Sequence, residues 1–400
     1  MLEFDDAQAR LLAVARPPTT TQACALAQAA GRVLAQPLVA RLDLPPADNS
    51  AMDGYAVRHA DLHPGVVLPI GQIAYAGQVP TALVPGQAAR ITTGGLVPPG
   101  ADTVVIQEDC EPQAAAVRVL AVPAPGSNIR RRGEDVAVGS PLVPAGTVLT
   151  PMHLGLLAAQ GWSEVPVWPR LRVAILTTGD ELVPPGQPLP PGAIHESNGI
   201  LLQAALAQLG CEVVAVRHVA DDLPALQAAL RQLAGIAQLI VTTGGVSVGD
   251  RDLVKPALEA LGGELALWKV RMKPGKPVAL GQVAGVPVLG LPGNPVSALV
   301  VLAVLASPMI RQWQGRLQPL PAVWPARLCT PAVHTDKREA FLRVQAEATA
   351  TGWQVRPHPQ QSSGILHGLS WATGVARLPA GVPHHNGASV AYYPFEAWLR

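Results

Sequence analysis

The feature that most constrains the fold is a repeated unit between residues 171 and 312, in which an apolar run ends in a glycine-containing loop. The runs LRVAIL, AQLIV and VPVLGL lead into TTGDEL, TTGGVSVGDRD and PGNP, respectively. Helical patterns occur between and after these runs, at 197–210, 223–234, 252–263 and 294–306. Continuously apolar strands that alternate with helices are typical of a parallel sheet covered on both faces. The sequence therefore predicts a parallel-sheet α/β domain over residues 169–314.

The segment before this domain follows a different pattern. Residues 1–36 look helical, as do residues 148–162, and short apolar runs separated by Gly and Pro lie between them. Such runs are typical of strands joined by turns. We therefore expect a β-rich domain inserted at 42–140, with the flanking segments 1–41 and 141–168 packed as one largely helical unit.

The segment after the α/β domain is again strand-like. A proline-bearing linker, LQPLPAVWPARL, precedes the runs FLRVQA, GWQVRP, GVARLP and SVAYYPF. These runs predict a small β-domain or a β-barrel over residues 320–400.

Composition excludes several classes of protein. The chain is 49% hydrophobic and 14% charged, which argues against disorder, and its net charge of +1 gives no electrostatic case for nucleic acid or an anionic membrane. The four cysteines are far apart in the sequence and form no CxxC pair, so neither a zinc site nor a disulfide framework is indicated. Acidic residues stand where a signal peptide would be basic, and we expect a cytoplasmic protein with reduced thiols. The longest apolar stretch, 296–310, is shorter than the roughly 18 residues of a membrane span and predicts a buried helix.

Polar loops at successive strand ends predict a binding site, because ligands bind outside the carboxyl ends of the strands in an open parallel sheet. These loops would bring together the carboxylates of Asp180, Glu181, Asp221, Asp222, Asp250 and Asp252 and the cations Lys269, Arg271, Lys273 and Lys276. Carboxylates and cations beside exposed backbone N–H groups suit an anionic substrate with a divalent metal. One such loop alone indicates only a turn or a helix cap, so the prediction depends on their repetition.

The loop TTGGVSVGDRD at 242–252 is the most informative of these. It is not a Walker A loop, because no Lys follows Gly249, and it is not a GxGxxG loop. Gly244 and Gly245 allow close approach of an anion to the backbone, and Ser247 adds a hydroxyl. Asp250 and Asp252 remain open to two interpretations, as helix caps or as metal ligands.

At this level of detail the chain resembles the molybdopterin molybdenumtransferase family, which is related to the C-terminal domain of gephyrin. The resemblance is carried by SVGDRDLVK, WKVRMKPGKP, GLPGNPVSAL, DNSAMDGYAVR, NIRRRGED and TGDEL, with FLRV and QSSGIL in the tail. It implies a discontinuous linker domain, an inserted β-rich domain, an α/β domain resembling molybdopterin adenylyltransferase and a C-terminal β-barrel. It also implies a homodimer whose active sites are shared between subunits. The implied reaction converts adenylyl-molybdopterin and molybdate to the molybdenum cofactor and AMP, with Mg²⁺ assisting.

Matching motifs carry the family's functional residues to this chain. The resemblance implies that the catalytic residues are Asp53, Thr93, Asp135, Glu181, Asp221, Asp252, Pro292 and Pro295. The expected substrate-binding residues are Thr178, Gly179, Asp180, Gly244, Gly245, Ser247, Gly249, Lys269, Lys273, Lys276, Gly293 and Asn294. Asp221, Asp252 and Glu181 are the expected metal ligands, and Asp53 and Thr93 are expected to reach the site from the second subunit. The segment HESN at 195–198 departs from the family pattern, with Glu196 in place of Asp.

Two other functions remain open at this point. An adenylyltransferase acting one step earlier would share the TGDE and TTGG loops, but it would lack the inserted and C-terminal domains. That upstream enzyme is also an expected partner. A gephyrin-like scaffold would need an apolar binding groove, which a sequence does not reveal.

Overall fold

The computed structural model describes residues 1–245, 252–263 and 265–400, and the side chains of all of these except 265–268. The described chain forms two compact units. One contains Met1–Gln36, Ala145–Pro151 and Glu164–Arg400, and the other contains Pro37–Pro144 and Met152–Ser163. The boundaries of the four predicted domains stay a prediction.

The larger unit contains a six-stranded sheet in the order β16-β13-β17-β21-β20-β18. The strands are β13 (Arg172–Thr178), β16 (Glu212–Val219), β17 (Leu239–Thr243), β18 (Leu265–Lys269), β20 (Pro277–Val283) and β21 (Val286–Leu291). The first four in the sheet order are parallel, as predicted. β20 runs antiparallel to both of its neighbours, β21 and β18, so it alone opposes the direction of the other strands in this sheet. The direction of β20 is reversed because β20 and β21 form a hairpin through Ala284 and Gly285, both at positive φ, the geometry of a tight two-residue turn.

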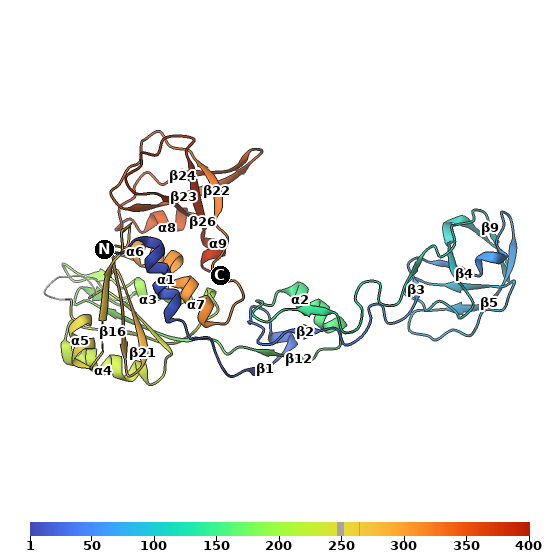
Figure 1. The fold of residues 1–400 in the computed structure, drawn as a ribbon, viewed down its shortest axis with the longest axis horizontal. Coiled ribbons are helices and arrows are strands. Elements are labelled where there is room, and N and C mark those ends of the chain that lie inside the picture. The colour runs from blue at the N-terminus through green and yellow to red at the C-terminus, as the bar shows by residue number, and fades with distance from the viewer. Residues whose placement is uncertain (246–251, 264) are drawn as a thin grey trace. The chain divides into compact units, whose positions relative to one another are not determined.

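Helices cover both faces of this sheet (Figure 1). They are α3 (Asn198–Gln208), α4 (Leu223–Ala234), α5 (Val254–Ala260), α6 (Pro295–Val301) and α7 (Ser307–Trp313). Val173 and Ile175 of β13 share a core with Leu202 of α3, whereas Ala174 and Leu176 share a second core with α4 and α5. The alternation along β13 shows that its two faces are both buried. A short pair, β14 (Leu182–Val183) and β15 (Ile194–His195), connects β13 to α3.

The apolar stretch at 296–310 forms a buried helix, as predicted. Helices α6 and α7 are joined by a π-helical segment, Leu302–Ala306. Among the described residues this continuous helix, Pro295–Trp313, is the one long and apolar enough to cross a membrane, but 94% of its most apolar window is buried inside the protein. The π-helical segment precedes Pro308, which has no N–H and whose ring crowds the preceding turn. Ser307 and Pro308 therefore change the helix type without ending the helix.

The N-terminal segment is less helical than predicted. Helix α1 spans only Phe4–Val14 and is followed by Pro17 and Pro18. The chain then forms β1 (Gln22–Ala25), which pairs antiparallel with β12 (Glu164–Val167), and a 3₁₀ turn, η1 (Leu26–Gln28). The prediction of helix over 1–36 is therefore wrong beyond Val14. The two prolines end the helix, and the residues after them pair with a distant strand.

The C-terminal part is a closed β-barrel, as predicted. Its strands are β22 (Trp324–Leu328), β23 (Glu339–Thr349), β24 (Gly352–Pro357), β25 (Gly374–Leu378) and β26 (Ser389–Pro394). They close in the order β23-β24-β22-β26-β25-β23, and the short β19 (Met272–Lys273) joins β23 from outside the ring. Two short helices, α8 (His367–Trp371) and α9 (Phe395–Trp398), complete this part.

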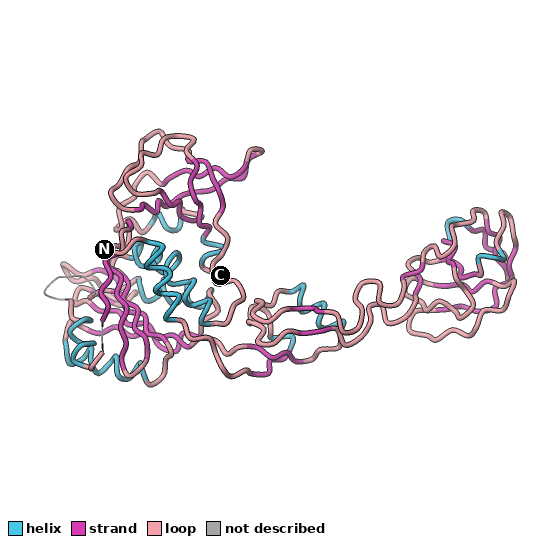
Figure 2. Tube along the Cα trace, viewed as in Figure 1, coloured by secondary structure: helices cyan, strands magenta, loops and turns pink. Residues whose placement is uncertain are grey.

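The smaller unit is rich in strands and loops, as predicted for the insert (Figure 2). A six-stranded sheet has the order β7-β4-β6-β5-β9-β8. Its strands are β4 (Gly54–Val57), β5 (Val67–Ala74), β6 (Ala88–Ile91), β7 (Thr103–Ile106), β8 (Cys110–Pro112) and β9 (Ala116–Val119), with 3₁₀ turns η2 (His59–Asp61) and η3 (Gln107–Asp109). Two short pairs lie outside it: β2 (Leu38–Val39) with β11 (Pro141–Val143), and β3 (Asn49–Ser50) with β10 (Ile129–Arg130). Helix α2 (Pro151–Ala159) falls where the sequence predicts helix.

Candidate functional site

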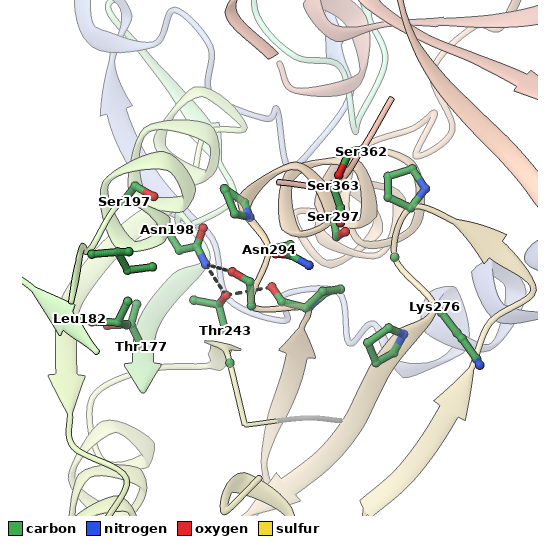
Figure 3. A pocket seen from close by; sticks show the side chains of 18 of the residues that line it. Thr177, Leu182, Ser197, Asn198, Thr243, Lys276, Asn294, Ser297, Ser362 and Ser363 are labelled. Atoms are coloured by element: carbon green, nitrogen blue, oxygen red, sulfur yellow. Dashed lines mark hydrogen bonds between the residues drawn. The ribbon is translucent and has the colours of Figure 1, made fainter. Parts of the chain in front are cut away.

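A cavity of about 720 Å³ opens at the carboxyl ends of β13, β17 and β21 (Figure 3). It lies at the edge of the sheet where the polar loops predict a binding site. The strand ends contribute Thr177, Thr178, Thr243 and Gly244, β19 contributes Lys273, and the neighbouring loops contribute Glu181, Lys276 and residues 292–294. Its wall also includes Arg338, Gln361, Ser362 and Ser363 from the C-terminal barrel. The cavity is therefore formed jointly by the α/β domain and the barrel.

Glycine residues allow the loop that begins at Gly244 to pack beside the loop at 292–294. Gly244 has a φ of 86°, and a Cβ there would lie 2.7 Å from the carbonyl oxygen of Thr178. A Cβ on Gly293 would lie 3.6 Å from the Cα of Gly244, at ordinary contact distance, so the two loops lie close together. A larger residue at Gly244 would both strain the backbone and separate the loop from β13.

Asn198 connects three segments of the cavity wall, and it is not among the site residues predicted from the sequence. Its Nδ2 donates to Thr243 Oγ1 at 2.9 Å and to the carbonyl oxygen of Gly293 at 2.6 Å. Thr243 Oγ1 in turn donates to the carbonyl oxygen of Pro292 at 3.0 Å. Figure 3 shows these bonds as dashed lines. The only sequence signal for Asn198 is its position at the start of a predicted helix, where it reads as a cap.

The helix cap of α3 comes instead from Glu196, the residue that departs from the family pattern. Glu196 Oε1 accepts a hydrogen bond from the Gly199 N–H at 2.7 Å. Ser197 occupies the N-cap position without a side-chain cap bond. The longer Glu side chain thus satisfies one of the free N–H groups at the start of this helix.

Three of the predicted carboxylates lie near the end of β13. Thr178 Oγ1 donates to Asp221 Oδ1 at 2.6 Å, and the Asp221 N–H donates to Asp180 Oδ1 at 3.0 Å. Glu181 lines the cavity, and its carboxylate lies against Gly179, where a Cβ would be 2.6 Å from Glu181 Oε2. Asp222 has a different role, because its carboxylate caps α4 by accepting from the Ala225 N–H.

The described residues do not form an all-protein metal cage. No three His, Cys, Asp or Glu side chains in the described parts of the chain are grouped so as to hold a metal ion. Mg²⁺ is usually bound by one or two carboxylates together with substrate phosphates and water. Glu181 on the wall and Asp221 behind Thr178 fit that pattern. Asp252 lies two residues before α5 and is not among the residues that line the cavity.

The cationic side of the cavity is made by Lys273, Lys276 and Arg338. Lys273 Nζ forms an ion pair with Asp336 at 2.9 Å, and Arg338 Nε lies 3.5 Å from the same carboxylate. Burial opposes ionisation of Asp336, but the hydrogen bond from Lys273 and the Arg338 N–H keep its pKa below the usual range.

Two other predicted cations lie outside the cavity wall. Lys269 is at the end of β18, where its carbonyl oxygen accepts from the Leu2 N–H. Arg271 is bonded to Glu3 and to the carbonyl oxygen of Lys337. Both therefore lie where the N-terminal segment meets the α/β domain.

The remaining predicted residues have these positions. Pro292, Gly293, Asn294 and Pro295 line the cavity, and Asn294 is the N-cap residue of α6 without a side-chain cap bond. Gly245 has a φ of 62° and packs against Val254. Ser247, Gly249 and Asp250 lie outside the described residues.

Asp53, Thr93 and Asp135 belong to the smaller unit. The Thr93 N–H and Oγ1 both donate to Asp53 Oδ1, at 2.7 and 2.9 Å. Both bonds lower the pKa of the Asp53 carboxyl, and the bond from the backbone N–H has the larger effect. Asp135 is exposed, and its N–H donates to the carbonyl oxygen of Leu44.

Comparison with known proteins identifies the family to which this chain belongs. Three family models match successive segments: the MoeA N-terminal region (domains I and II) matches residues 2–161, a probable molybdopterin binding domain matches 174–312, and the MoeA C-terminal region (domain IV) matches 326–395. A relative from Mycobacterium tuberculosis, molybdopterin molybdenumtransferase 2, is 41% identical over 389 residues, which are 94% of each chain. The chain belongs to the molybdopterin molybdenumtransferase family.

Other members agree in sequence and in fold. The molybdopterin molybdenumtransferase of Haemophilus influenzae is 39% identical over 320 residues, 80% of this chain and 79% of that one. The crystal structure of the molybdopterin biosynthesis MoeA protein from Pyrococcus horikoshii matches with a TM-score of 0.83 at 30% identity, covering all of both chains. The family's fold therefore extends over the whole chain, including the barrel that contributes to the cavity.

Proposed function

We propose that this chain inserts molybdenum into the pterin cofactor, converting adenylyl-molybdopterin and molybdate to the molybdenum cofactor and AMP. As a member of the family it is a transferase of molybdenum cofactor biosynthesis. The observation that carries the proposal is the cavity itself. It gathers TGDEL, KPGKP and LPGNP, three of the segments that carry the resemblance, around one space of about 720 Å³. That volume lies within the range of small-molecule sites, roughly 300–1,000 Å³.

The charges and hydroxyls of the cavity suit anionic substrates. Lys273, Lys276 and Arg338 attract phosphate and molybdate oxygens. Ser297, Ser362 and Ser363 add hydroxyl groups that donate to such oxygens. Because molybdate transfer to sulfur and release of AMP need no protein nucleophile, the residues act by positioning the anions and neutralising their charge.

Mg²⁺ is part of this proposal. Bound Mg²⁺ would supply charge neutralisation at the phosphoanhydride. Asp221 and Asp252, with Glu181 in support, are the proposed protein ligands, and phosphate oxygens would complete the coordination.

We also propose a homodimer with shared active sites, in which Asp53 and Thr93 act on the cavity of the other subunit. The support is the resemblance and the hydrogen-bonded pair that these two residues form in the smaller unit. Mixing an inactive Asp53→Ala chain with an inactive Asp252→Ala chain tests this arrangement. Recovery of activity in hybrid dimers is expected, and no recovery would mean that the residues do not act across subunits.

A cytoplasmic location and transfer of substrate from the upstream adenylyltransferase complete the proposal. The four cysteines are all free, as suits a reducing compartment.

The decisive experiment supplies purified protein with adenylyl-molybdopterin and molybdate. Active cofactor and AMP are expected in equal amounts. A parallel reaction contains molybdopterin and ATP instead. Steady formation of adenylyl-molybdopterin in that reaction, without insertion in the first, would assign the chain to the upstream step.

A further inference from the structure

The two carbonyl groups of Pro292 and Gly293 are held by one short hydrogen-bond network that starts at Asn198. Asn198 Nδ2 carries two N–H groups, and both are used, one on Gly293 and one on Thr243. The single hydroxyl hydrogen of Thr243 then goes to Pro292. The first residue of α3, the end of β17 and the loop before α6 are therefore connected by three bonds.

The direction of these bonds is fixed by chemistry. Backbone carbonyl oxygens only accept, so the residue facing Gly293 must donate. Thr243 has one hydrogen, which it gives to Pro292, so it must accept from Asn198. An acceptor-only side chain at position 198 breaks two bonds and places a negative charge against a carbonyl oxygen at 2.6 Å.

The other end of the amide supports the same interpretation. Asn198 Oδ1 is inaccessible to solvent and finds no donor among the described residues. Most buried polar atoms in folded proteins are hydrogen-bonded. The site keeps an amide although its acceptor is unused, which indicates that the two donor bonds are the reason for its presence.

The network acts on the cavity because its members line it. Asn198, Thr243, Pro292 and Gly293 are all wall residues, and Gly293 packs against Gly244 of the neighbouring loop. A shift of about 1 Å in a substrate-positioning group can lower a rate about a hundredfold. A small displacement of the loop at 292–294 would therefore reach the bound substrate directly.

We propose that Asn198 is a positioning residue of the site, which holds the loop at 292–294 in register with the loop at 243–244. The effect on turnover rests on the proposed molybdenum insertion, whereas the effect on the loop does not. Asn198 need not touch the reacting atoms for its loss to lower the rate.

The central test is Asn198→Asp, which preserves size and removes the donors. At neutral pH we expect kcat to fall about a hundredfold, with KM changed much less, because the loop is displaced while the cations of the cavity remain. Protonation of the new carboxyl restores one donor, so the ratio of variant to wild-type kcat should rise as the pH falls. Loss of fold stability alone would not produce this pH-dependent recovery.

Gln203→Glu is the matched control. It makes the same amide-to-carboxylate change on α3 at an exposed position. Wild-type kcat is expected for this variant at every pH. A fall like that of Asn198→Asp would show that charge on α3, and not the network, determines the rate, and would overturn the proposal.

Thr243→Val supplies a second variant and a double-mutant cycle. It removes the link to Pro292, so it should slow turnover by itself. Because Asn198 and Thr243 act through one network, the double variant should be little slower than Asn198→Asp. Multiplicative losses would mean that the two residues act independently.

Amide hydrogen exchange separates this proposal from the proposed function. Exchange at Ala298, whose N–H donates to the carbonyl oxygen of Asn294 at the end of this loop, should become about tenfold faster in Asn198→Asp than in wild type, and should be unchanged in Gln203→Glu. Unchanged exchange in Asn198→Asp, or wild-type kcat in that variant, overturns the positioning role. A wild-type protein that inserts no molybdenum contradicts the proposed function, and the exchange result then decides the positioning role without it.

Discussion

Thr178 Oγ1 donates to Asp221 Oδ1 across 2.6 Å, which joins the end of β13 to the loop after β16. Thr178 is only 6% exposed, and it lines the cavity while Asp221 lies behind it. Thr178→Val keeps the shape and removes the donor. Since a hydrogen bond to a charged group contributes about 1.5–3 kcal/mol, we expect molybdenum insertion to slow by roughly ten- to a hundredfold. Thr178→Ser retains the hydroxyl and should stay near the wild-type rate. Equal rates for the Val and Ser variants would show that this bond does not matter.

The ion pair between Lys273 and Asp336 predicts a variant that binds anions more tightly. Asp336→Asn removes a carboxylate that partly neutralises Lys273 and Arg338 at the cavity wall. The affinity for molybdate should rise severalfold at low salt, because one negative charge a few ångströms away contributes about 1 kcal/mol in a mostly aqueous setting. Calorimetric titration at two salt concentrations measures the effect, which added salt should reduce. The pair is partly exposed, so the free energy of unfolding should fall by no more than about 1 kcal/mol. Unchanged or weaker molybdate binding at low salt would contradict the prediction.

Much of the α/β domain could be predicted because its information is local. The runs before Thr178, Thr243 and Pro292 are apolar, and each ends in a glycine or proline loop, so the strand ends and the site at that edge follow from the sequence. The antiparallel hairpin at Ala284–Gly285 carried only a weak turn signal. The reversal of the chain here depends on positive φ at both residues. Alanine usually adopts negative φ, so the pair Ala-Gly does not by itself indicate this turn.

The parts of the site that could not be predicted depend on distant packing. Arg338, Ser362 and Ser363 reach the cavity only because the barrel packs beside the α/β domain. Asn198 has the sequence context of an ordinary helix cap, and its role depends on Thr243 and Gly293, which are far away in the chain. Lys269 and Lys273 occur in the same motif, yet only Lys273 lines the cavity.

Arg377 should be a major contributor to the packing of α1 on the barrel. Its guanidinium bonds Asp5 of α1 and Glu339 of β23, and it lies over the ring of Phe4. Burial opposes the charge, but the bonds to Asp5 and Glu339 raise the pKa of Arg377 above its usual value, so it stays charged. Arg377→Met leaves Glu339, which is 15% exposed, without its cation. We expect the free energy of unfolding in urea to fall by about 2–4 kcal/mol.

Arg271→Met is the matched control for this prediction. Arg271 also reaches the N-terminal segment, through Glu3, but both of these side chains are about half exposed. Its loss should cost less than about 1 kcal/mol. Similar losses for the two variants would mean that burial does not distinguish the pairs.

The four thiols should differ sharply in reactivity. Burial raises the pKa of Cys211 to about 12 and that of Cys110 to about 11, so both remain protonated in the folded protein at pH values near 8. Cys329 is partly exposed, and its thiol lies near Gln354. Because the thiolate is the reactive form, iodoacetamide should modify Cys329 first, and Cys211 only as the chain unfolds.

The same shift predicts how stability depends on pH. A thiol whose folded pKa is raised contributes stability below its unfolded pKa of about 8.5, and this contribution is lost as the pH rises toward the folded value. The free energy of unfolding in urea should therefore decline above about pH 8.5, and that of Cys211→Ala should decline less steeply over that range.

For the alkylation prediction, mass spectrometry of alkylated peptides gives the order of labelling, and Cys329→Ser should remove the fast reaction. Native Cys211 that reacts as fast as Cys329 would contradict its burial between the α/β sheet and its neighbouring helices.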